Sequence, residues 1–321
     1  MSMTVSLKDI QKAIRKMDPV RDIVGVIEEG FVAYSRGEVV VPPVGEMIFD
    51  DPRGDTHIKY GFIKHDDVFV IKIASGFYEN YKKGLPTSHG LILVFSQKTG
   101  ELICSLQDEG YLTQIRTAAA GAVVGRYFAP EQVQRVGVFG AGSQGRLQVE
   151  YLKYVRNFLD VVVWGLDQEE LDRYREDMEV KGFRVQTTFD PEEIASTCNL
   201  IITATPSQKP LLLAQQIRKG THITAIGSDT ADKQELDSLI LQKADRVIVD
   251  SLCQGWLRGE IHQGIKSGVI GRDKPVELGA AILDHKLHRQ ADDEITVADL
   301  TGVAVQDIQI SKAVWKFISA R

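Results

Sequence analysis

The sequence predicts an α/β protein whose larger part is a doubly wound parallel sheet and whose smaller part is an α+β domain. Between about residues 135 and 250, short apolar runs alternate with helix-like stretches. This alternation is typical of parallel strands that helices cover on both faces. Before residue 120, strand-like runs follow one another with only turns between the later ones, which favours an antiparallel or mixed sheet in a separate domain.

Each expected element rests on a local pattern. The chain begins with a charged amphipathic helix pattern and continues with the strand-like runs HIKYGFI, VFVIKIAS and LILVFS. An Ala-rich helix over 113–128 leads into the parallel runs RVGVF, DVVVW, RVQTT, LIITAT, HITAIG and RVIVD. Further helices are expected over 168–182, over 233–244 and at QDIQISKAVWKFIS near the C-terminus. The expected domains are 1–120, completed by 296–321, and 121–295.

The composition argues against several classes of protein. The chain has 321 residues and a net charge of −6, which argues against a nucleic-acid partner. The N-terminal segment is too charged for a signal peptide, and no uncharged apolar run approaches the length of a membrane span. Cys104, Cys198 and Cys253 lack CxxC spacing, so we expect reduced thiols in a cytoplasmic protein. His285 and His288 have no carboxylate at a ligand spacing, so no metal is expected.

A glycine-rich stretch follows the first apolar run of the parallel part. VGVF leads into GAGSQG, and a helical pattern comes next. Strand, GxGxxG and helix in this order are typical of a dinucleotide-binding turn. Gly140 would permit the tight turn, Gly142 would let a pyrophosphate approach the backbone, and Gly145 would let the helix pack on the strand. The helix N-terminus would point free N–H groups at the phosphates. The residues assigned here to the cofactor are Gly140, Ala141, Gly142, Ser143, Gln144 and Gly145.

Several stretches together resemble the ornithine cyclodeaminase/mu-crystallin family. They lie in the family's order at KIASGFYENYKKGLPT (72–87), LTQIRTAAAGA (112–122), GAGSQG (140–145), IGSDTADKQEL (226–236) and DLTGVAVQD (299–307). The resemblance implies a Rossmann domain that binds NAD(P), here 121–295. It also implies a second domain that binds substrate and forms a homodimer, here 1–120. The chemistry it implies is hydride transfer at the α-carbon of an amino or imino acid.

The resemblance also implies roles for individual residues. Arg116, in the pattern L-T-x-x-R-T, would bind the substrate carboxylate, which suits a planar guanidinium. Lys72 would lie in the catalytic pocket with a pKa lowered by burial, and Thr87 would contact substrate. Asp229 would exchange a proton at the end of a parallel strand. From the residues alone, a surface arginine, an outward-facing lysine, a turn threonine and a helix-capping aspartate are the alternatives.

The residues at the end of the second parallel strand indicate whether NAD or NADP is preferred, because an acid there usually binds the ribose. VVVWGLDQ places Gly165 at that position and Asp167 two residues later. No arginine or lysine follows at once to hold a 2′-phosphate. We therefore expect NAD(H) and leave NADP(H) open. Asp167 and Thr117 complete the residues assigned to the cofactor.

Two positions depart from the ornithine cyclodeaminases. Lys59 replaces the glutamate that those enzymes carry thirteen residues before the position of Lys72. No arginine in PVGEM matches one that they carry further upstream. A glutamate suits a second amine on the substrate and a lysine does not, so ornithine is disfavoured. Lys59 is assigned to the substrate pocket, with an exposed position on the strand as the alternative. Another carboxylate, such as Glu46 or Glu79, could supply the missing charge.

Three functions fit these patterns. The first is an NAD(P)H-dependent imino-acid (ketimine) reductase or amino-acid dehydrogenase. The second is an ornithine cyclodeaminase, which converts L-ornithine to L-proline and ammonia with NAD as a catalytic cofactor. The third is a non-enzymatic, crystallin-like protein that binds the cofactor. The presence of Lys72, Arg116 and Asp229 together argues against the third.

Overall fold

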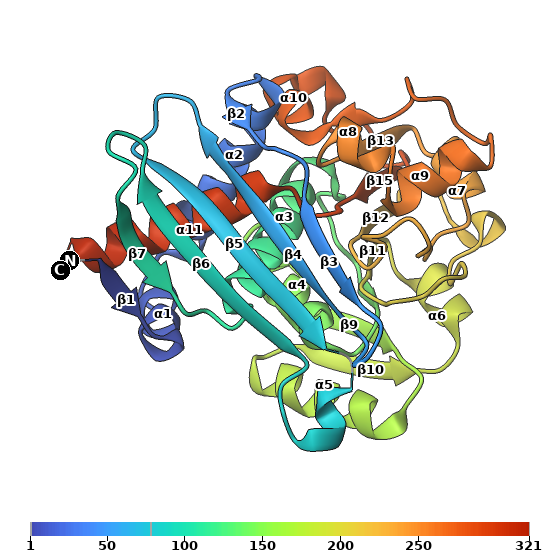
Figure 1. Ribbon diagram of the computed structural model, residues 1–321. Coiled ribbons are helices and arrows are strands. Elements are labelled where there is room, and N and C mark those ends of the chain that lie inside the picture. Colours follow the sequence, from blue (N-terminus) through green and yellow to red (C-terminus); the bar gives the residue numbers. More distant parts are fainter. Residues whose placement is uncertain (1, 78, 321) are drawn as a thin grey trace. The chain divides into compact units, whose positions relative to one another are not determined.

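The computed structural model describes residues 2–77 and 79–320, and the chain divides into two compact units (Figure 1). Unit 1 comprises the chain up to Arg116 together with Ala304 onward, and unit 2 comprises Thr117–Val303. Helix α3 (Tyr111–Phe128) contains the point of division.

Unit 1 contains a mixed sheet, as the sequence predicts. Its strand order is β1-β7-β6-β5-β4-β2, with β3 paired to β4. Only the pairing of β1 with β7 is parallel among those described. The strands are β1 (Met3–Val5), β2 (Val39–Val40), β3 (Gly45–Phe49), β4 (Gly54–Ile63), β5 (Val68–Phe77), β6 (Ser88–Ser96) and β7 (Leu102–Leu106).

The N-terminal helix begins later than the sequence predicts. Met3–Val5 forms a strand, and α1 (Leu7–Ile14) follows because the Ser6 hydroxyl accepts the Asp9 N–H at 3.3 Å and caps the helix. The π-helix η1 (Pro19–Val24) and helix α2 (Gly25–Ser35) come next, and η2 (Asn80–Lys83) precedes β6. Helix α11 (Ala304–Ser319) packs on α2 and on strands β4 and β5.

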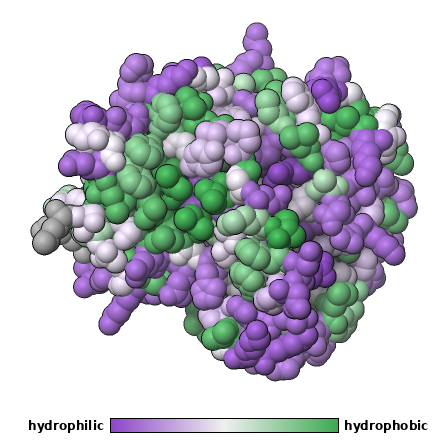
Figure 2. Space-filling model, viewed as in Figure 1, coloured by the Kyte–Doolittle hydropathy of each residue, from purple (hydrophilic) through white to green (hydrophobic). Residues whose placement is uncertain are grey.

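The two faces of this sheet differ in what lies against them. Val68, Val70 and Lys72 alternate along β5 on the face that is buried under α11. The opposite face carries half-buried apolar side chains from neighbouring strands. In Figure 1, α2 and α11 lie behind the strands, and Figure 2 shows apolar side chains gathered over the near face. These residues are Phe69, Ile71, Ile73, Leu91, Leu93 and Phe95, joined by Tyr60, which is 37% exposed.

Unit 2 is a doubly wound parallel sheet, which confirms the predicted fold class. Its order is β10-β9-β8-β11-β12-β15-β13-β14, and the described pairings are parallel. The direction of winding reverses between β8 and β11, which is where such sheets bind ligands. The strands are β8 (Val136–Phe139), β9 (Asp160–Trp164), β10 (Arg184–Thr188), β11 (Leu200–Thr203), β12 (His222–Ala225), β13 (Arg246–Val249), β14 (Val276–Glu277) and β15 (Thr296–Asp299).

Helices pack on both faces of the unit 2 sheet. One buried cluster joins Val149 of α4 and Leu171 of α5 to the strands. Another joins Ile194 of α6 and Ile261 of α9 to the strands. The helices are α4 (Ser143–Leu152), α5 (Gln168–Val180), α6 (Pro191–Thr197), η3 (Ala214–Gln216), α7 (Leu239–Lys243), α8 (Leu252–Gly255), α9 (Gly259–Lys266), α10 (Leu278–Leu283) and η4 (His285–Leu287).

Two sequence-based boundaries were wrong. The helix expected over 233–244 is helical only from Leu239, because the N–H groups of Glu235 and Leu236 donate to the Glu260 carboxylate instead of to a preceding turn. The segment expected to leave the large domain at 296 instead forms β15, which pairs with β12 and β13. The return to unit 1 therefore begins at Ala304.

Two further expectations concern cysteines and membrane spans. Cys104 and Cys198 are buried, Cys253 is exposed, and all three are free thiols. Within the described residues, none of the helices is long and apolar enough to cross a membrane.

Candidate active site

The buried centre of unit 1 is a cluster of two cations on one carboxylate. Lys72 of β5 donates from Nζ to Asp307 Oδ1 at 2.9 Å and to Thr113 Oγ1 at 3.1 Å. Arg116 of α3 donates from Nε to the same Asp307 oxygen at 3.2 Å and from Nη1 to Gln306 Oε1 at 2.8 Å. Lys72 and Arg116 are 3% and 5% exposed. Helices α3 and α11 and strand β5 thus bring distant residues together.

Burial sets the electrostatics of this cluster. Burial lowers the pKa of Lys72, Asp307 opposes that effect, and Arg116 adds to it. Burial alone would raise the pKa of Asp307, but the two nearby cations lower it to about 2. Asp307 is therefore a carboxylate at neutral pH, and it keeps both cations in fixed positions. Arginine and lysine are the side chains that form charge-assisted hydrogen bonds with carboxylates.

Some polar atoms of the cluster are buried without a partner among the described residues. They are Asp307 Oδ2, Gln306 Nε2 and Asp108 Oδ1. Asp108 accepts the Leu112 N–H at 3.0 Å near the start of α3, and burial raises the pKa of its carboxyl. Buried polar atoms of proteins are generally hydrogen-bonded, and the two carboxylate oxygens among these atoms would accept from a donor.

Sequence reasoning assigned Lys72 and Arg116 to the substrate pocket, and the structure brings these two residues together, but it gave no role to Asp307 and Gln306. Both lie in the motif DLTGVAVQD, where the acid was not assigned a role. The available signal was an acid inside VAVQDIQI, a segment with five apolar residues, and all of this segment is buried at the start of α11.

Other residues assigned to substrate lie nearby or on the surface of unit 1. Lys59 on β4 is half-buried directly across from Lys72 in the strand register, and it also lowers the pKa of Asp307. Thr87 is exposed just before β6. Glu46 lies 3.4 Å from His57, and Glu79 forms an exposed ion pair with Lys82 at 2.8 Å.

The three glycines of the turn in unit 2 differ in how much room the structure leaves for a side chain. Gly140 has φ of 107°, and a Cβ there would lie 2.7 Å from the Ala204 carbonyl oxygen. A Cβ on Gly145 would collide with the carbonyl oxygen of Gly140. Gly142 is different, because a Cβ there would meet no described atom within 4 Å. The protein itself therefore requires glycine at 140 and 145, while position 142 borders open space.

That open space fits the pyrophosphate of a dinucleotide. Gly142 is the N-cap of α4 and makes no side-chain cap, and a helix N-terminus of this kind favours an anion such as a phosphate. Arg146 donates to the carbonyl oxygens of Ala141 and Gly142 and to Asp177 at 2.9 Å, which braces the turn. Ser143 and Gln144 begin the helix itself.

The end of β9 adjoins this turn, since a Cβ on Gly165 would lie 3.8 Å from Cβ of Ala141. Leu166 is 84% exposed, and Asp167 accepts the Glu170 N–H at 2.9 Å as the N-cap of α5. Thr117 is half-buried, and its carbonyl oxygen accepts from Gln148 Nε2 at 2.9 Å.

Asp229 lies in the loop after β12. Its side chain is 52% exposed, and Oδ1 accepts from Lys233 Nζ at 2.6 Å. The next helix, α7, begins after Ser238, so Asp229 does not cap it. A carboxylate that is accessible and oriented by a lysine is suited to proton exchange.

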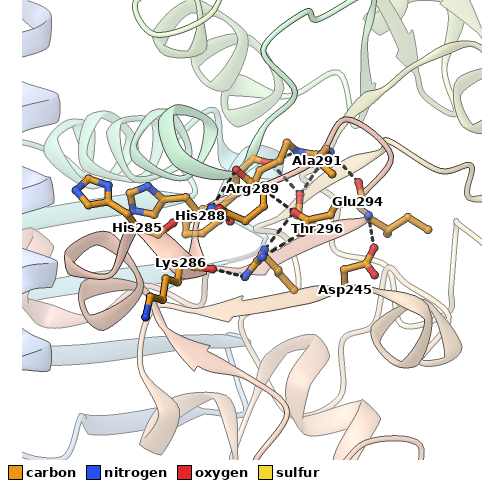
Figure 3. Close-up of polar contacts among 12 residues, drawn as sticks. Asp245, His285, Lys286, His288, Arg289, Ala291, Glu294 and Thr296 are labelled. Atoms are coloured by element: carbon orange, nitrogen blue, oxygen red, sulfur yellow. Dashed lines mark hydrogen bonds and ion pairs between the residues drawn. The ribbon is translucent and has the colours of Figure 1, made fainter.

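A basic hollow elsewhere in unit 2 is structural rather than catalytic. Its volume is about 490 Å³, and Arg126, Arg156, His288 and Arg289 line it. Figure 3 shows Arg289 among main-chain groups, to which it donates at Phe128 O (2.8 Å) and Glu294 O (2.7 Å). Arg156 donates to Arg126 O at 2.8 Å. These guanidiniums satisfy carbonyls at the C-terminus of α3. In residues 2–77 and 79–320, no group of His, Cys, Asp and Glu is arranged to hold a metal.

Comparison with known proteins gives the family. The profile of the ornithine cyclodeaminase/mu-crystallin family matches residues 5–321. The chain belongs to this family. A solved archaeal alanine dehydrogenase dimer with bound NAD is 30% identical, with a TM-score of 0.90 over 99% of this chain and 96% of that one.

Other solved members are equally similar in fold. The iminosuccinate reductase of Paracoccus denitrificans, in complex with NAD⁺, is 29% identical with a TM-score of 0.91, over 99% of this chain and 97% of that one. The Δ1-pyrroline-2-carboxylate reductase of Thermococcus litoralis, in complex with NADH and L-proline, is 26% identical with a TM-score of 0.90, over 99% and 98%.

Proposed function

We propose that this protein is an NAD(H)-dependent imino-acid reductase or amino-acid dehydrogenase. The observation that carries the proposal is the buried pair of Lys72 and Arg116 on the Asp307 carboxylate. Related proteins of this fold act on alanine, iminosuccinate and pyrroline-2-carboxylate, and each of these compounds carries a carboxylate next to a carbon–nitrogen bond. A fixed pair of cations suits that shared group.

The chain's own residues would bind the substrate and move its proton. Arg116 and Lys72 would hold the α-carboxylate, and Asp307 would keep the two cations in place. Asp229, oriented by Lys233, would give a proton to the substrate nitrogen in reduction and take one in oxidation. NAD(H), when bound, supplies the hydride donor or acceptor.

The cofactor is assigned to the turn in unit 2. Gly142 and the N–H groups at the start of α4 would bind the pyrophosphate, and Asp167, two residues beyond the usual acid position, would bind the ribose. The sequence Gly165-Leu166-Asp167 offers no cation for a 2′-phosphate and places a carboxylate nearby. This arrangement favours NAD(H) over NADP(H), since two anions would repel each other.

Lys59 disfavours ornithine. A substrate with a second ammonium group would bring a fourth cation to Lys59, Lys72 and Arg116, with Asp307 as the ionised carboxylate beside them. Like charges at short range in a poorly solvated site are costly unless paired. Glu46 and Glu79 are exposed and interact with His57 and Lys82.

A homodimer is proposed from the apolar open face of the unit 1 sheet. That face carries Phe69, Ile71, Leu93 and Phe95 in adjacent strands, and Phe69 stacks on Phe95 with ring centroids 4.8 Å apart. A contiguous apolar surface of this kind is typical of an interaction site, and the archaeal alanine dehydrogenase is a dimer. We expect the protein to act in the cytoplasm.

A turnover panel tests the proposed function. It would offer Δ1-pyrroline-2-carboxylate with NADH or NADPH, pyruvate with ammonia or methylamine and either cofactor, and L-ornithine with NAD⁺. We expect imino-acid reduction to exceed ornithine deamination by at least about tenfold in kcat/KM. Release of ammonia and proline from L-ornithine, without any imine reduction, would instead identify a cyclodeaminase. Binding of NADH without turnover of any compound would favour a crystallin-like role.

The variant Lys59→Glu provides a matched control for the charge argument. It restores the carboxylate found in ornithine cyclodeaminases and leaves Lys72 and Arg116 in place. We expect it to shift the ratio of ornithine turnover to imine reduction by at least about tenfold toward ornithine. An unchanged ratio would show that Lys59 does not face the substrate.

A further inference from the structure

A buried glutamate of unit 2 holds the loops that follow two neighbouring strands. Glu235 lies beyond the loop after β12, and it is 0% exposed. Oε1 accepts from the Thr205 N–H at 2.6 Å and from the Thr205 hydroxyl at 2.7 Å. Oε2 accepts from the Thr203 hydroxyl at 2.7 Å and from the Gly227 N–H at 2.9 Å. Four donors therefore converge on one side chain.

The ionised form of Glu235 suits this environment. An ionised carboxylate has about four acceptor sites and no donor, so it satisfies all four groups, whereas a protonated carboxyl would add an O–H among donors. Burial raises the pKa of Glu235, and the bonds from Thr205 and Thr203 oppose that effect. Hydrogen bonds to an ionised acceptor are stronger than those between neutral groups.

The main chain of Glu235 is fixed as well. Its N–H donates to Glu260 Oε1 at 2.7 Å, and its carbonyl oxygen accepts from the Leu211 N–H at 2.7 Å. At Gly227 the two loops approach main chain to main chain, because a Cβ there would collide with the Thr205 carbonyl oxygen. The main chain that carries the Glu235 carboxylate is therefore held in place, and the two loops that the carboxylate binds are packed closely together.

These bonds connect the cofactor turn to the loop that carries Asp229. Thr203 ends β11, and the loop after it touches the glycine turn: the Ala204 N–H donates to Phe139 O at 2.9 Å, and a Cβ on Gly140 would lie 2.7 Å from Ala204 O. Gly227 begins the loop that includes Asp229 and ends at Glu235 itself. The Glu235 side chain therefore joins the two ends of the Asp229 loop. It also attaches this loop to the segment after β11, which contacts the glycine turn.

We propose that Glu235 is a positioning residue that sets the Asp229 loop and the cofactor turn in one fixed arrangement. This proposal rests on the proposed function for the role of Asp229. Glu235 acts through the main chains of Thr205 and Gly227, so its loss is expected to affect cofactor binding and turnover together. Binding of the imino-acid carboxylate, which we assign to unit 1, is expected to change little.

The test is Glu235→Gln, which keeps the size of the side chain. Each oxygen of Glu235 accepts two hydrogen bonds. In the glutamine an NH₂ group replaces one of these oxygens, so two of the four donors lose their acceptor. We expect the Kd for NADH to rise at least about tenfold, equal to about 1.4 kcal/mol. We also expect kcat to fall at least tenfold, with the KM for the imino acid changed less than about threefold. Amide hydrogen exchange in 204–208 and 227–235 is expected to accelerate without cofactor.

Two sets of variants separate positioning from general destabilisation. Glu294→Gln removes a largely buried carboxylate that binds Arg246 at 3.0 Å. Glu294 (Figure 3) precedes the amino end of β15, whereas Glu235 binds the loops at the carboxyl ends of β11 and β12. It is expected to lower Tm and leave NADH affinity unchanged. Thr203→Val removes one donor to Glu235, and Thr203→Ser keeps the hydroxyl. We expect the valine variant to weaken NADH binding and the serine variant to restore it.

Unchanged NADH affinity and loop exchange in Glu235→Gln would overturn the proposal. An equal loss of NADH affinity in Glu294→Gln at the same Tm would also overturn it, because the effect would then be general destabilisation. The titration and the exchange measurement need no substrate. A protein that turns over no imino acid would therefore contradict the proposed function while these two measurements still decide the role of Glu235.

Discussion

Replacing Asp307 by asparagine is expected to destabilise unit 1 strongly. Asp307 Oδ1 accepts from both Lys72 and Arg116, and all three side chains are at most 6% exposed. Asparagine keeps the size but leaves two buried cations without a counter-charge. Breaking a buried ion pair by removing one partner costs about 3–5 kcal/mol. The lowered pKa of Asp307 gives a separate, smaller measure of the same interaction.

That measure follows from the pKa itself. The pKa of Asp307 is about 2 in the folded chain, against an ordinary value of 3.8. A depression of this size corresponds to about 2 kcal/mol. Because the folded pKa is the lower one, this stabilisation is present above about pH 4 and disappears as the pH falls toward 2. The expected loss of unfolding free energy at pH 7 is therefore about 2–5 kcal/mol.

Urea unfolding followed by circular dichroism at several pH values would measure this loss, and hydrogen exchange of the α11 amides would assign it to unit 1. The matched control is Asp67→Asn, which removes an exposed ion pair with Lys98 in the same unit. Its urea midpoint is expected to change little. The reasoning would be refuted if Asp307→Asn lowered the free energy of unfolding no more than Asp67→Asn does. It would also be refuted if the loss in Asp307→Asn were the same at pH 2 as at pH 7.

Other variants test the remaining assignments. Gly142→Val is expected to fold normally, since position 142 borders open space, and to lose at least about 2 kcal/mol of NADH affinity in a titration. Asp229→Asn should retain NADH binding and lose at least about 10²-fold in kcat, whereas Arg116→Ala should raise KM for the imino acid by a loss of about 2–5 kcal/mol. Near-normal kinetics in both would place the site elsewhere. Burial raises the pKa of Glu260 to about 8 from 4.5, so its carboxyl stabilises the fold fully below about pH 4.5 and progressively less as the pH rises to 8. Glu260→Gln should remove this slope from the pH dependence of Tm.

The sequence predicted the elements whose patterns are local. Apolar runs alternating with amphipathic helices gave the parallel sheet of unit 2, and the glycine spacing located the turn after β8. Strand β15 was harder to recognise, because TVAD is short and is separated along the chain from the strands beside it. Its place depends on pairing between distant segments, which local periodicity does not encode.

The candidate site shows the same limit. Lys72 and Arg116 could be named because each stands in a distinctive stretch, but their shared partner Asp307 lies 235 and 191 residues away in sequence. The segment 233–238 has a helix-like pattern, yet its N–H groups at 235 and 236 are bound by the Glu260 carboxylate. Tertiary hydrogen bonds override local helix preference in such segments.

The apolar open face of the unit 1 sheet links the stability of the chain to its own concentration. Phe69, Ile71 and Leu93 lie on this face, half-buried within one chain. If two copies pair there, dissociation returns those side chains to water, and association stabilises the folded state by mass action. Dilution would then lower Tm, and a charged side chain in the middle of the face would remove that dependence by favouring the separated chains.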